Sequence, residues 1–269
     1  MGQVKDTQEE IDWTTWYNFQ GRMGIPIIHL GGARATRDLL ALCNITEESV
    51  VLDVGCGTGY TVCEIAQKYG SHVVGIDISQ DMIAKAQERA YQHHLRSVEF
   101  KVEDVFDLSF QDETFDVIIM ESVLTILPGE KHDALTELKR VLKTGGVVGA
   151  NEDFARPETP EEILNRLAAV LPIKTLLTPQ NLRQLFEDSQ LEVIHFIENP
   201  TKGVITSREV VDIMRTMGLG RLLSYSVRSL VDPEVRQIGK YYREGSNIMI
   251  KYKDTRDFFG YALIVGKKV

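Results

Sequence analysis

The strongest constraint on the fold comes from residues 50–59, which read Val-Val-Leu-Asp-Val-Gly-Cys-Gly-Thr-Gly. The first half is apolar and mostly β-branched, as expected for a strand buried on both faces of a parallel sheet. Gly55, Gly57 and Gly59 follow at every second position, and an amphipathic run then predicts a helix that stops at Gly70. A strand, a glycine turn and a helix N-terminus together predict a nucleotide-type binding loop, because bare main chain and unpaired N–H groups face the ligand.

Acidic residues follow the predicted strands in the first half of the chain. Asp77, Asp104, Glu121 and Glu152 each come at or just after the end of an apolar segment. Strands that alternate with helical runs predict a doubly wound parallel sheet, whose carboxyl ends lie along one edge. Ligands of open α/β sheets bind at that edge, so we expect these carboxylates in one crevice. The segments in question are 72–76, 98–102, 115–120 and 147–150.

The glycine spacing separates two classes of binding loop. A dinucleotide loop, G-x-G-x-x-G, would have its third glycine at position 60, where the chain has Tyr60. The pattern D-x-G-x-G-x-G, from Asp53 to Gly59, instead resembles the first motif of the class I S-adenosylmethionine-dependent methyltransferases. The resemblance, closest to small-molecule members of methyltransferase type 11, covers about residues 45–152 and departs from the usual proline at Thr144. Its further segments are V-V-G-I-D-I-S, E-D-V, F-D-V-I-I-M-E-S-V-L and E-L-K-R-V-L-K-T-G-G.

This resemblance implies a Rossmann-like α/β fold with a seven-stranded sheet in the order 3-2-1-4-5-7-6 and an antiparallel last strand. Strand-like segments at 191–197 and 260–267 would serve as strands six and seven. N-terminal helices and a helical lid inserted before the last strand would surround the core. The expected domains are a helical cap at 1–44, a methyltransferase core at 45–199 and 259–269, and a lid at 200–258.

The resemblance also assigns residues to the cofactor, S-adenosyl-L-methionine. The first two glycines of the loop would lie against its methionine part, and Glu121 near the methionine end. Asp77 would hold the ribose hydroxyls, because a carboxylate accepts two hydrogen bonds from a diol. Ile78 would flank the adenine, and Asp104 with Val105 would read the adenine edge. The expected cofactor-binding residues are Tyr17, Asp53, Gly55, Gly57, Asp77, Ile78, Asp104, Val105 and Glu121.

The aromatic cluster that contains Tyr17 has helical spacing and includes Trp13 and Trp16. Burial of these rings against the core explains such a cluster, and the same burial would not exclude a lid over a ligand site. Both interpretations remain open from the sequence.

Three residues are candidates for catalysis. His29 precedes a glycine pair in a loop expected beside the cofactor, which makes it a candidate base, although a single histidine is more often structural. Glu121 and Glu152, with Asp153, would form an acidic rim suited to an amine, another cationic acceptor, or a metal-assisted hydroxyl. In the alternative interpretation Glu121 only orients the cofactor, while Glu152 and Asp153 are solvated. No metal-binding residues are predicted.

The sequence therefore predicts an S-adenosylmethionine-dependent methyltransferase that acts on a small molecule by in-line displacement. The asparagine-proline-proline-aromatic signature of amide and base methylation is absent, since the chain reads Glu121-Ser122-Val123-Leu124 there. A net charge of −9 and a pI of about 5.3 argue against broad nucleic-acid binding. A methyltransferase that acts on protein or RNA, and a cofactor-binding module without turnover, remain alternatives.

Composition predicts a cytoplasmic protein without a membrane span. The chain is 43% hydrophobic and 26% charged, and its N-terminus is polar and acidic rather than signal-like. Cys43, Cys56 and Cys63 include no C-x-x-C pair, and we interpret them as small apolar residues of a reduced protein. A joint role in binding zinc or a soft metalloid is the alternative. The oligomeric state cannot be predicted from the sequence.

Overall fold

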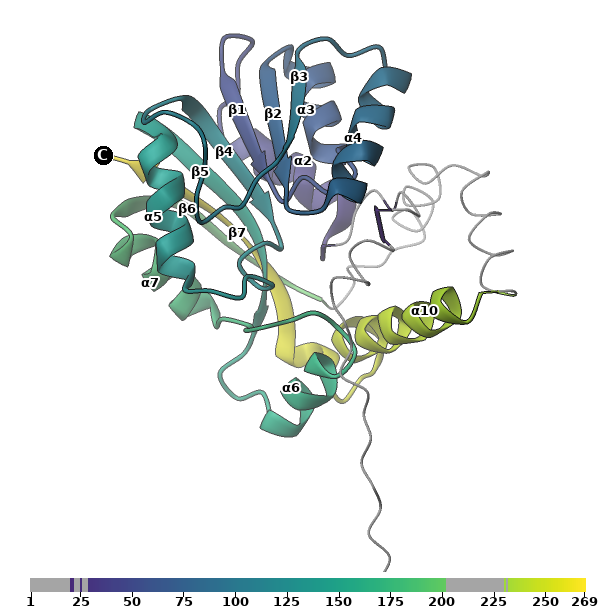
Figure 1. The fold of residues 1–269 in the computed structure, drawn as a ribbon. Helices are drawn as coiled ribbons and strands as arrows, with labels where there is room; N and C mark the ends of the chain where they lie inside the picture. The colour runs from purple at the N-terminus through teal and green to yellow at the C-terminus, as the bar shows by residue number, and fades with distance from the viewer. Residues whose placement is uncertain (1–19, 22–24, 26–28, 202–229, 231) are drawn as a thin grey trace, which may run out of the picture.

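The computed structural model describes residues 20–21, 25, 29–201, 230 and 232–269. Its centre is one seven-stranded sheet in the order β3-β2-β1-β4-β5-β7-β6 (Figure 1), which confirms the predicted fold class and strand order. Strand β7 is antiparallel to both of its neighbours, and the other neighbouring pairs are parallel. The strands are β1 (Val50–Val54), β2 (His72–Asp77), β3 (Val98–Val102), β4 (Phe115–Glu121), β5 (Leu142–Ala155), β6 (Leu191–Pro200) and β7 (Phe259–Lys268).

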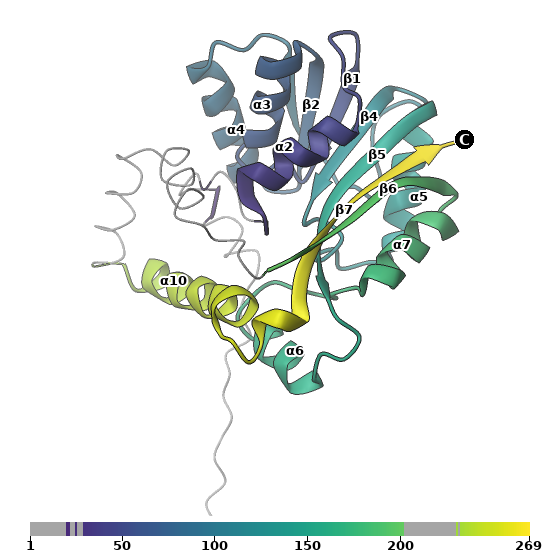
Figure 2. The same ribbon diagram turned by 180° about the vertical axis from the view of Figure 1, so that it is seen from behind.

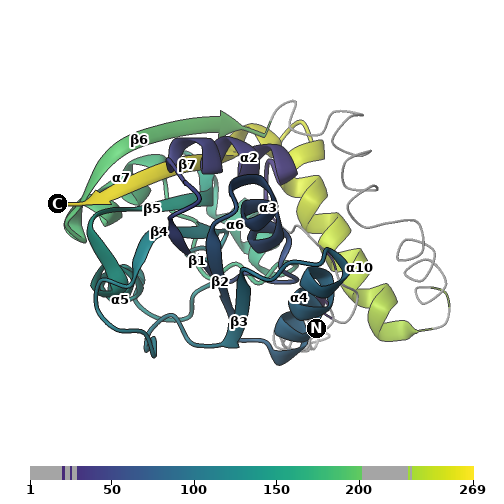
Figure 3. The same ribbon diagram turned by 90° about the horizontal axis from the view of Figure 1, so that it is seen from above.

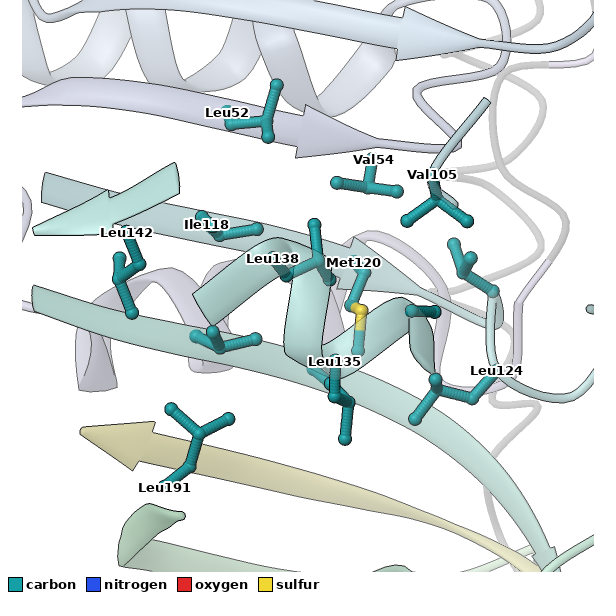
Figure 4. Packing of buried hydrophobic residues seen from close by; sticks show 14 of the residues in the cluster. Leu52, Val54, Val105, Ile118, Met120, Leu124, Leu135, Leu138, Leu142 and Leu191 are labelled. Atoms are coloured by element: carbon teal, nitrogen blue, oxygen red, sulfur yellow. The ribbon is translucent and has the colours of Figure 1, made fainter. Parts of the chain in front are cut away.

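Helices cover both faces of this sheet. Helices α5 and α7 pack on one face, and α2, α3 and α4 pack on the other (Figures 1 and 2). The core divides according to the pleat: Leu52 belongs to the α5 side and Val51 to the α2 side. Figure 4 shows Leu138 of α5 among side chains of β4 that include Met120. The helices are α2 (Gly32–Leu42), α3 (Tyr60–Tyr69), α4 (Gln80–Gln92), α5 (Lys131–Val141), α6 (Glu161–Ala168), α7 (Pro179–Asp188) and α10 (Pro233–Ser246).

Several helix ends follow from local sequence. The Ser79 hydroxyl accepts a hydrogen bond from the Met82 N–H and caps α4, as its position before the helix predicts. Thr178 caps α7 in the same way, with Pro179 in the first turn. Helix α3 ends at Gly70, whose φ of 76° is left-handed.

Strand β5 differs from its predicted extent. The apolar segment 147–150 predicted a short strand, but β5 runs from Leu142 to Ala155. Antiparallel β7 pairs with it from Val147 to Ala155 and therefore supports it past the predicted end. Asn151, Glu152 and Asp153 thus lie within the strand, and the pleat places the middle one on the opposite face from the other two.

Helices α6 and α10 lie beyond the carboxyl ends of the parallel strands (Figures 1 and 2). Seen from above, the strands are arranged side by side from β6 to β3 (Figure 3). A Cβ on Gly245 of α10 would lie 2.5 Å from the Leu171 side chain, so α10 packs closely on the segment after α6. A π-helix at Asn247–Lys251 and a 3-10 helix at Arg256–Phe258 lead into β7. No helix in the described ranges has the length and apolar character needed to cross a bilayer.

The predicted division into cap, core and lid stays a prediction. Helix α2 belongs to the expected cap but packs directly against β5 and β7 of the core. The aromatic cluster with Tyr17, and residues 202–229 of the expected lid, lie outside the described residues. The cytoplasmic location also stays a prediction.

Candidate active site

The loop after β1 has three glycines in left-handed conformations, with φ of 64°, 52° and 77° at Gly55, Gly57 and Gly59. A Cβ on Gly55 would lie 2.8 Å from Val123, and one on Gly59 would lie 2.8 Å from Ala86, so both positions allow close packing. A Cβ on Gly57 would have no described atom within 4 Å. The main chain at Gly57 is therefore bare and open, as the approach of a ligand requires.

Asp77 fixes the shape of this loop from the end of β2. Its Oδ2 accepts a hydrogen bond from the Gly57 N–H at 3.0 Å, and its Oδ1 accepts one from the Ser79 N–H at 2.8 Å. Burial raises the pKa of Asp77, and these two N–H groups oppose the shift. Each oxygen keeps a second lone pair, which is what a ribose diol needs. The neighbouring Ile78 is 71% exposed, an apolar surface suited to an adenine face.

The adenine end is formed where β2 and β3 end side by side. The Glu103 N–H donates to the Asp77 carbonyl at 3.3 Å, which places the segment after β3 beside the end of β2. Asp104 is exposed, and its Oδ1 accepts from the Phe106 N–H at 3.1 Å. Val105 is buried in the core beneath it. The structure thus brings these residues to the predicted edge, and their contacts with adenine stay predictions.

Two residues that the sequence analysis did not assign, Arg89 and Thr58, stabilise the glycine loop by hydrogen bonds. Arg89 of α4 is buried, and its Nε donates to the Thr58 carbonyl at 2.8 Å. The Thr58 hydroxyl donates to the Ile25 carbonyl at 3.0 Å and so ties the N-terminal segment to the loop. Arg89 lies on the same helical stripe as Met82 and Ala86, and a charged residue on an apolar stripe was the available signal.

Three acids, Asp53, Asp77 and Glu121, lie at or near the carboxyl ends of the adjacent strands β1, β2 and β4. Burial raises the pKa of Asp53 well above its ordinary value, and the charges of Glu121 and Asp77 raise it further. Like charges have this effect only at short range. The strand topology therefore places these carboxylates where their charges act on one another.

Glu121 lies in a buried network with His29. Its carboxylate accepts hydrogen bonds from the hydroxyls of Thr36 at 2.9 Å and Thr61 at 2.8 Å, and His29 Nε2 lies 3.3 Å from Oε1. The other ring nitrogen, Nδ1, lies 2.9 Å from Asn151 Nδ2. When Asn151 donates to Nδ1, the neutral ring carries its proton on Nε2, toward Glu121. The two predicted catalytic groups thus form a carboxylate–histidine pair, and their catalytic roles stay predictions.

Thr36 and Thr61 were not assigned from sequence, although a signal existed. Thr36 shares the buried stripe of α2 with Leu39 and Leu40, and Thr61 is buried in the first turn of α3. A hydroxyl within an apolar stripe needs a partner, because an unpaired buried polar group is costly. The partner, Glu121, could not be identified without the fold.

Glu152 points to the opposite face of β5 and contacts a different part of the molecule. Its carboxylate accepts from the N–H groups of Val123 at 2.9 Å, Leu124 at 3.0 Å and Thr125 at 3.2 Å, and from the Thr125 hydroxyl at 3.0 Å. Burial raises the pKa of Glu152 to about 7, although these donors favour the ionised form. The contacts give Glu152 a positioning role for the loop after β4. Its predicted catalytic role is supported by none of them and stays a prediction.

Buried polar atoms without a partner are concentrated at this edge of the sheet. Within the described part of the chain, six buried side-chain atoms lack a hydrogen bond, and four of them are oxygens of Asp53, Ser122, Asn151 and Asp153. Most buried polar atoms in folded proteins are paired. A ligand that brings hydrogen-bond donors and positive charge would satisfy these oxygens, and S-adenosylmethionine brings an ammonium group, ribose hydroxyls and a positively charged sulfur.

The three cysteines are buried free thiols. Burial raises the pKa of Cys43 to about 12 and that of Cys63 to about 11. A Cβ on Gly149 would lie only 2.5 Å from the Cys43 sulfur. The sulfur therefore fills the space beside β5. These surroundings agree with small apolar side chains in the core.

Comparison with known proteins gives concordant matches. Residues 45–190 match the family model described as a methyltransferase domain. An uncharacterized protein of Haemophilus influenzae is 31% identical over 176 residues, which are 64% of this chain and 70% of that protein. Phosphoethanolamine N-methyltransferase 1 of Arabidopsis thaliana is 38% identical over 138 residues, 51% of this chain but 28% of the plant protein. The matched part thus spans little more than a quarter of the plant enzyme.

A solved structure of geranyl diphosphate methyltransferase in complex with S-adenosylmethionine matches with a TM-score of 0.62. It covers 87% of this chain and 84% of the other, and at 17% identity it shows the fold alone. The family model covers more than half of the chain, including the glycine loop and the ends of β1 to β5. The chain therefore belongs to the methyltransferase domain family of class I S-adenosylmethionine-dependent methyltransferases.

Proposed function

We propose that this protein methylates a small-molecule acceptor. The observation that supports the proposal is that three described residues near the N-terminus, Gly21, Ile25 and Leu30, contact the carboxyl edge of the sheet. A Cβ on Gly21 would be 3.0 Å from the start of α4, the Ile25 carbonyl accepts from Thr58, and the Leu30 carbonyl accepts from Asn151 at 3.2 Å. Contacts of this kind leave less room for a polymer, which needs an open groove, than for a small acceptor.

The residues described above divide the work of binding. When bound, S-adenosylmethionine supplies an electrophilic methyl group on its sulfonium. Gly57, Asp77 and Ile78 would hold its methionine, ribose and adenine parts, and Asp53 offers an unpartnered oxygen for its ammonium group. Positioning and exclusion of water account for most of the rate that such a site can provide. The predicted contact of Tyr17 lies outside the described residues.

Glu121 and His29 would handle the proton of an acceptor that carries one. Thr36 and Thr61 fix the carboxylate, and Asn151 fixes the ring, so the pair is held in one orientation before any ligand binds. Glu121 is the last residue of β4, and β4 pairs with β1, the strand that leads into the glycine loop. The pair is therefore well placed to take up a proton beside the acceptor.

The names of relatives agree with a small acceptor. The plant relative is named for phosphoethanolamine, a small amine that carries a phosphate group. An arsenite methyltransferase of Halobacterium salinarum is 32% identical over 42% of this chain. This chain matches 28% of the plant protein and 29% of the arsenite methyltransferase, so these names support the class of acceptor and not its identity.

Calorimetry tests the cofactor site directly. We expect S-adenosylmethionine to bind wild-type protein and Asp77→Ala to weaken binding by roughly 10- to 100-fold, the range for loss of a charge-assisted hydrogen bond. NAD should not bind measurably. Tight NAD binding, or unchanged affinity in Asp77→Ala, would contradict the assignment.

Incubation with methyl-labelled cofactor and a cell metabolite extract tests the acceptor class. The expected result is label in a small molecule. Label only in added protein or RNA would favour a polymer acceptor, and cofactor binding without any transfer would favour a module that lacks turnover. His29→Ala in the same assay should slow transfer while leaving cofactor affinity within about threefold, since its contacts are to Glu121 and Asn151.

A further inference from the structure

We propose that Ser122, Asn151 and Asp153 form an acceptor subsite that binds an amine or ammonium group through its N–H bonds. This inference rests on the proposed function and specifies the class of acceptor. We call these three residues the polar trio. Ser122 directly follows β4, and Asn151 and Asp153 lie in the last part of β5. These two strands are neighbours in the sheet, and β1 lies between them and β2.

Backbone pairing brings the trio together. The Ser122 N–H donates to the Asn151 carbonyl at 2.7 Å. Asn151 and Asp153 are two residues apart on one strand and share a face of the sheet, the face that α2 covers. Burial raises the pKa of Asp153 to about 6, and His29, the Leu30 N–H and the Ser122 hydroxyl all lie close enough to oppose this shift. The three side chains therefore belong to one cluster.

Each member of the trio has an oxygen that no described residue satisfies. Ser122 Oγ, Asn151 Oδ1 and Asp153 Oδ1 are all buried and lack a hydrogen-bond partner within the described ranges. The Leu30 N–H and the Ser122 hydroxyl both lie near the Asp153 carboxylate and lower its pKa, while Ser122 Oγ and Asp153 Oδ1 have no partner within hydrogen-bonding geometry. Asn151 is 0% exposed, so bulk water does not solvate its amide oxygen.

The orientation of the Asn151 amide is fixed by its other contacts. Its Nδ2 lies 3.2 Å from the Leu30 carbonyl and 2.9 Å from His29 Nδ1. Rotating the amide would set its oxygen against the Leu30 carbonyl, and two carbonyl oxygens repel one another. With Nδ2 donating to the Leu30 carbonyl, the amide oxygen lies on the side away from Leu30 and His29, without a donor.

Ser122 is held in a strained conformation. Its φ of 55° is left-handed, which is unusual for serine. Three of the other non-glycine residues with positive φ, Asn44, His94 and Gln190, follow the ends of helices, where this conformation is common. Ser122 instead follows a strand, and the Glu152 carboxylate holds the three N–H groups immediately after it.

The chemistry of the trio selects the ligand. A carboxylate, an amide oxygen and a hydroxyl can all accept hydrogen bonds, and together they call for a group with several donors. A primary ammonium has three N–H donors and a positive charge, whereas an alcohol has a single O–H and an anion would be repelled by Asp153. Since the raised pKa of Asp153 is about 6, the carboxylate is mostly ionised at neutral pH and can pair with an ammonium group.

A competing explanation is that the trio is satisfied internally. A proton on Asp153 could be shared with the Asn151 amide oxygen, and no ligand would then be needed. Asp153→Asn separates the two explanations, because its side-chain amide supplies N–H donors of its own in nearly the same volume. If the trio is satisfied internally, Asp153→Asn leaves the affinity for amines unchanged. If the trio binds amines, the variant loses that affinity.

The test uses the full chain saturated with S-adenosylhomocysteine, titrated with ethanolamine or with 1-propanol, which has a methyl group in place of the ammonium. Thermal shift and calorimetry should show ethanolamine binding in about the millimolar range and no binding of 1-propanol. Asp153→Asn should weaken ethanolamine binding at least tenfold and leave S-adenosylhomocysteine binding unchanged. Asp116→Asn, an acid-to-amide change at the other end of β4, should leave both unchanged.

Three outcomes would overturn the proposal: no ethanolamine binding, equal binding of 1-propanol, or full ethanolamine affinity in Asp153→Asn. A wild-type protein that fails to bind S-adenosylhomocysteine would instead contradict the proposed function. Far-UV circular dichroism of each variant distinguishes loss of the subsite from loss of the fold.

Discussion

At the amino edge of the sheet, Asp116 pairs with Lys143 at 2.8 Å and accepts from the Val50 N–H at 2.9 Å. At the carboxyl edge, an oxygen of Asp53 is buried without any partner in the described part of the protein. The pKa values follow this difference. Burial acts to raise the pKa of Asp116, but Lys143 and Val50 lower it overall, whereas burial and the neighbouring charges of Glu121 and Asp77 raise that of Asp53.

The same contrast extends to other acids at the two edges. Hydrogen bonds from Thr144 and Lys268 lower the pKa of Glu113, which lies just before β4. Burial raises the pKa of Asp77 and Asp153 at the other edge. Partners within the protein stabilise Asp116 and Glu113 at the amino edge, whereas burial disfavours the charged forms of Asp53, Asp77 and Asp153 at the carboxyl edge. Such local sacrifice of stability is common at functional sites.

The largest loss of stability is expected on removal of Glu152, an acid of the carboxyl edge whose carboxylate has four hydrogen-bond donors. Glu152→Ala would leave three buried N–H groups and the Thr125 hydroxyl without an acceptor, and we expect it to lower the free energy of unfolding by about 3 kcal/mol. Asp153→Ala, one residue away on the opposite face, should lower it by about 1 kcal/mol or less. Urea unfolding measures both. Equal losses would show that the two faces of β5 do not differ.

The pH dependence of stability should have opposite signs at the two edges. Because the folded pKa of Asp153 is raised from 3.8 to about 6, its contribution is complete below pH 3.8 and is lost as the pH rises through 6. We expect wild type to lose about 2 kcal/mol relative to Asp153→Asn between pH 4 and pH 7 in urea unfolding. The lowered pKa of Asp116 gives a contribution that is present above pH 3.8 and is lost at lower pH. Parallel curves for wild type and Asp153→Asn would contradict the prediction.

A matched pair of glycine substitutions separates backbone strain from ligand binding. Gly57 and Gly145 both have positive φ and open space at the Cβ position, but Gly145 lies at the amino edge. Each change to alanine should lower the free energy of unfolding by about 1 kcal/mol. Only Gly57→Ala should weaken S-adenosylmethionine binding, by about tenfold or more, since its methyl group would occupy the ligand space. Calorimetry would reveal a similar loss in Gly145→Ala if loop strain alone were responsible.

The smallest loss of stability is expected from Asp116→Asn. The ion pair with Lys143 is partly exposed, and such pairs contribute about 0.5 kcal/mol. We expect a loss of that size in urea unfolding at pH 7, reduced further at high salt. Cofactor affinity should not change. A large loss of affinity would mean that the two edges are coupled through β4.

The parts of the site that could be predicted are those set by local sequence. The glycine loop, Asp77 and the cap at Ser79 lie within about 30 residues of one another, and their spacing reflects one β-α-β unit. Glu121 was found because it ends an apolar strand, but its partners Thr36 and Thr61 lie 85 and 60 residues away. Patterns within a single element cannot identify such partners.

By itself, the sequence determined the fold class, the strand order through family resemblance, and the cofactor loop, because periodicity and glycine conformation act over a few residues. The tertiary structure alone decided which buried acids are satisfied by protein donors and which keep an unpaired oxygen. Pairing with β7, more than 100 residues later, extends β5 and places Glu152 and Asp153 on opposite faces. Glu152 therefore meets four donors, while Asp153 retains an oxygen without any among the described residues. Two adjacent acids thus acquire different roles, because the pleat alternates and the neighbours on each face come from distant parts of the chain.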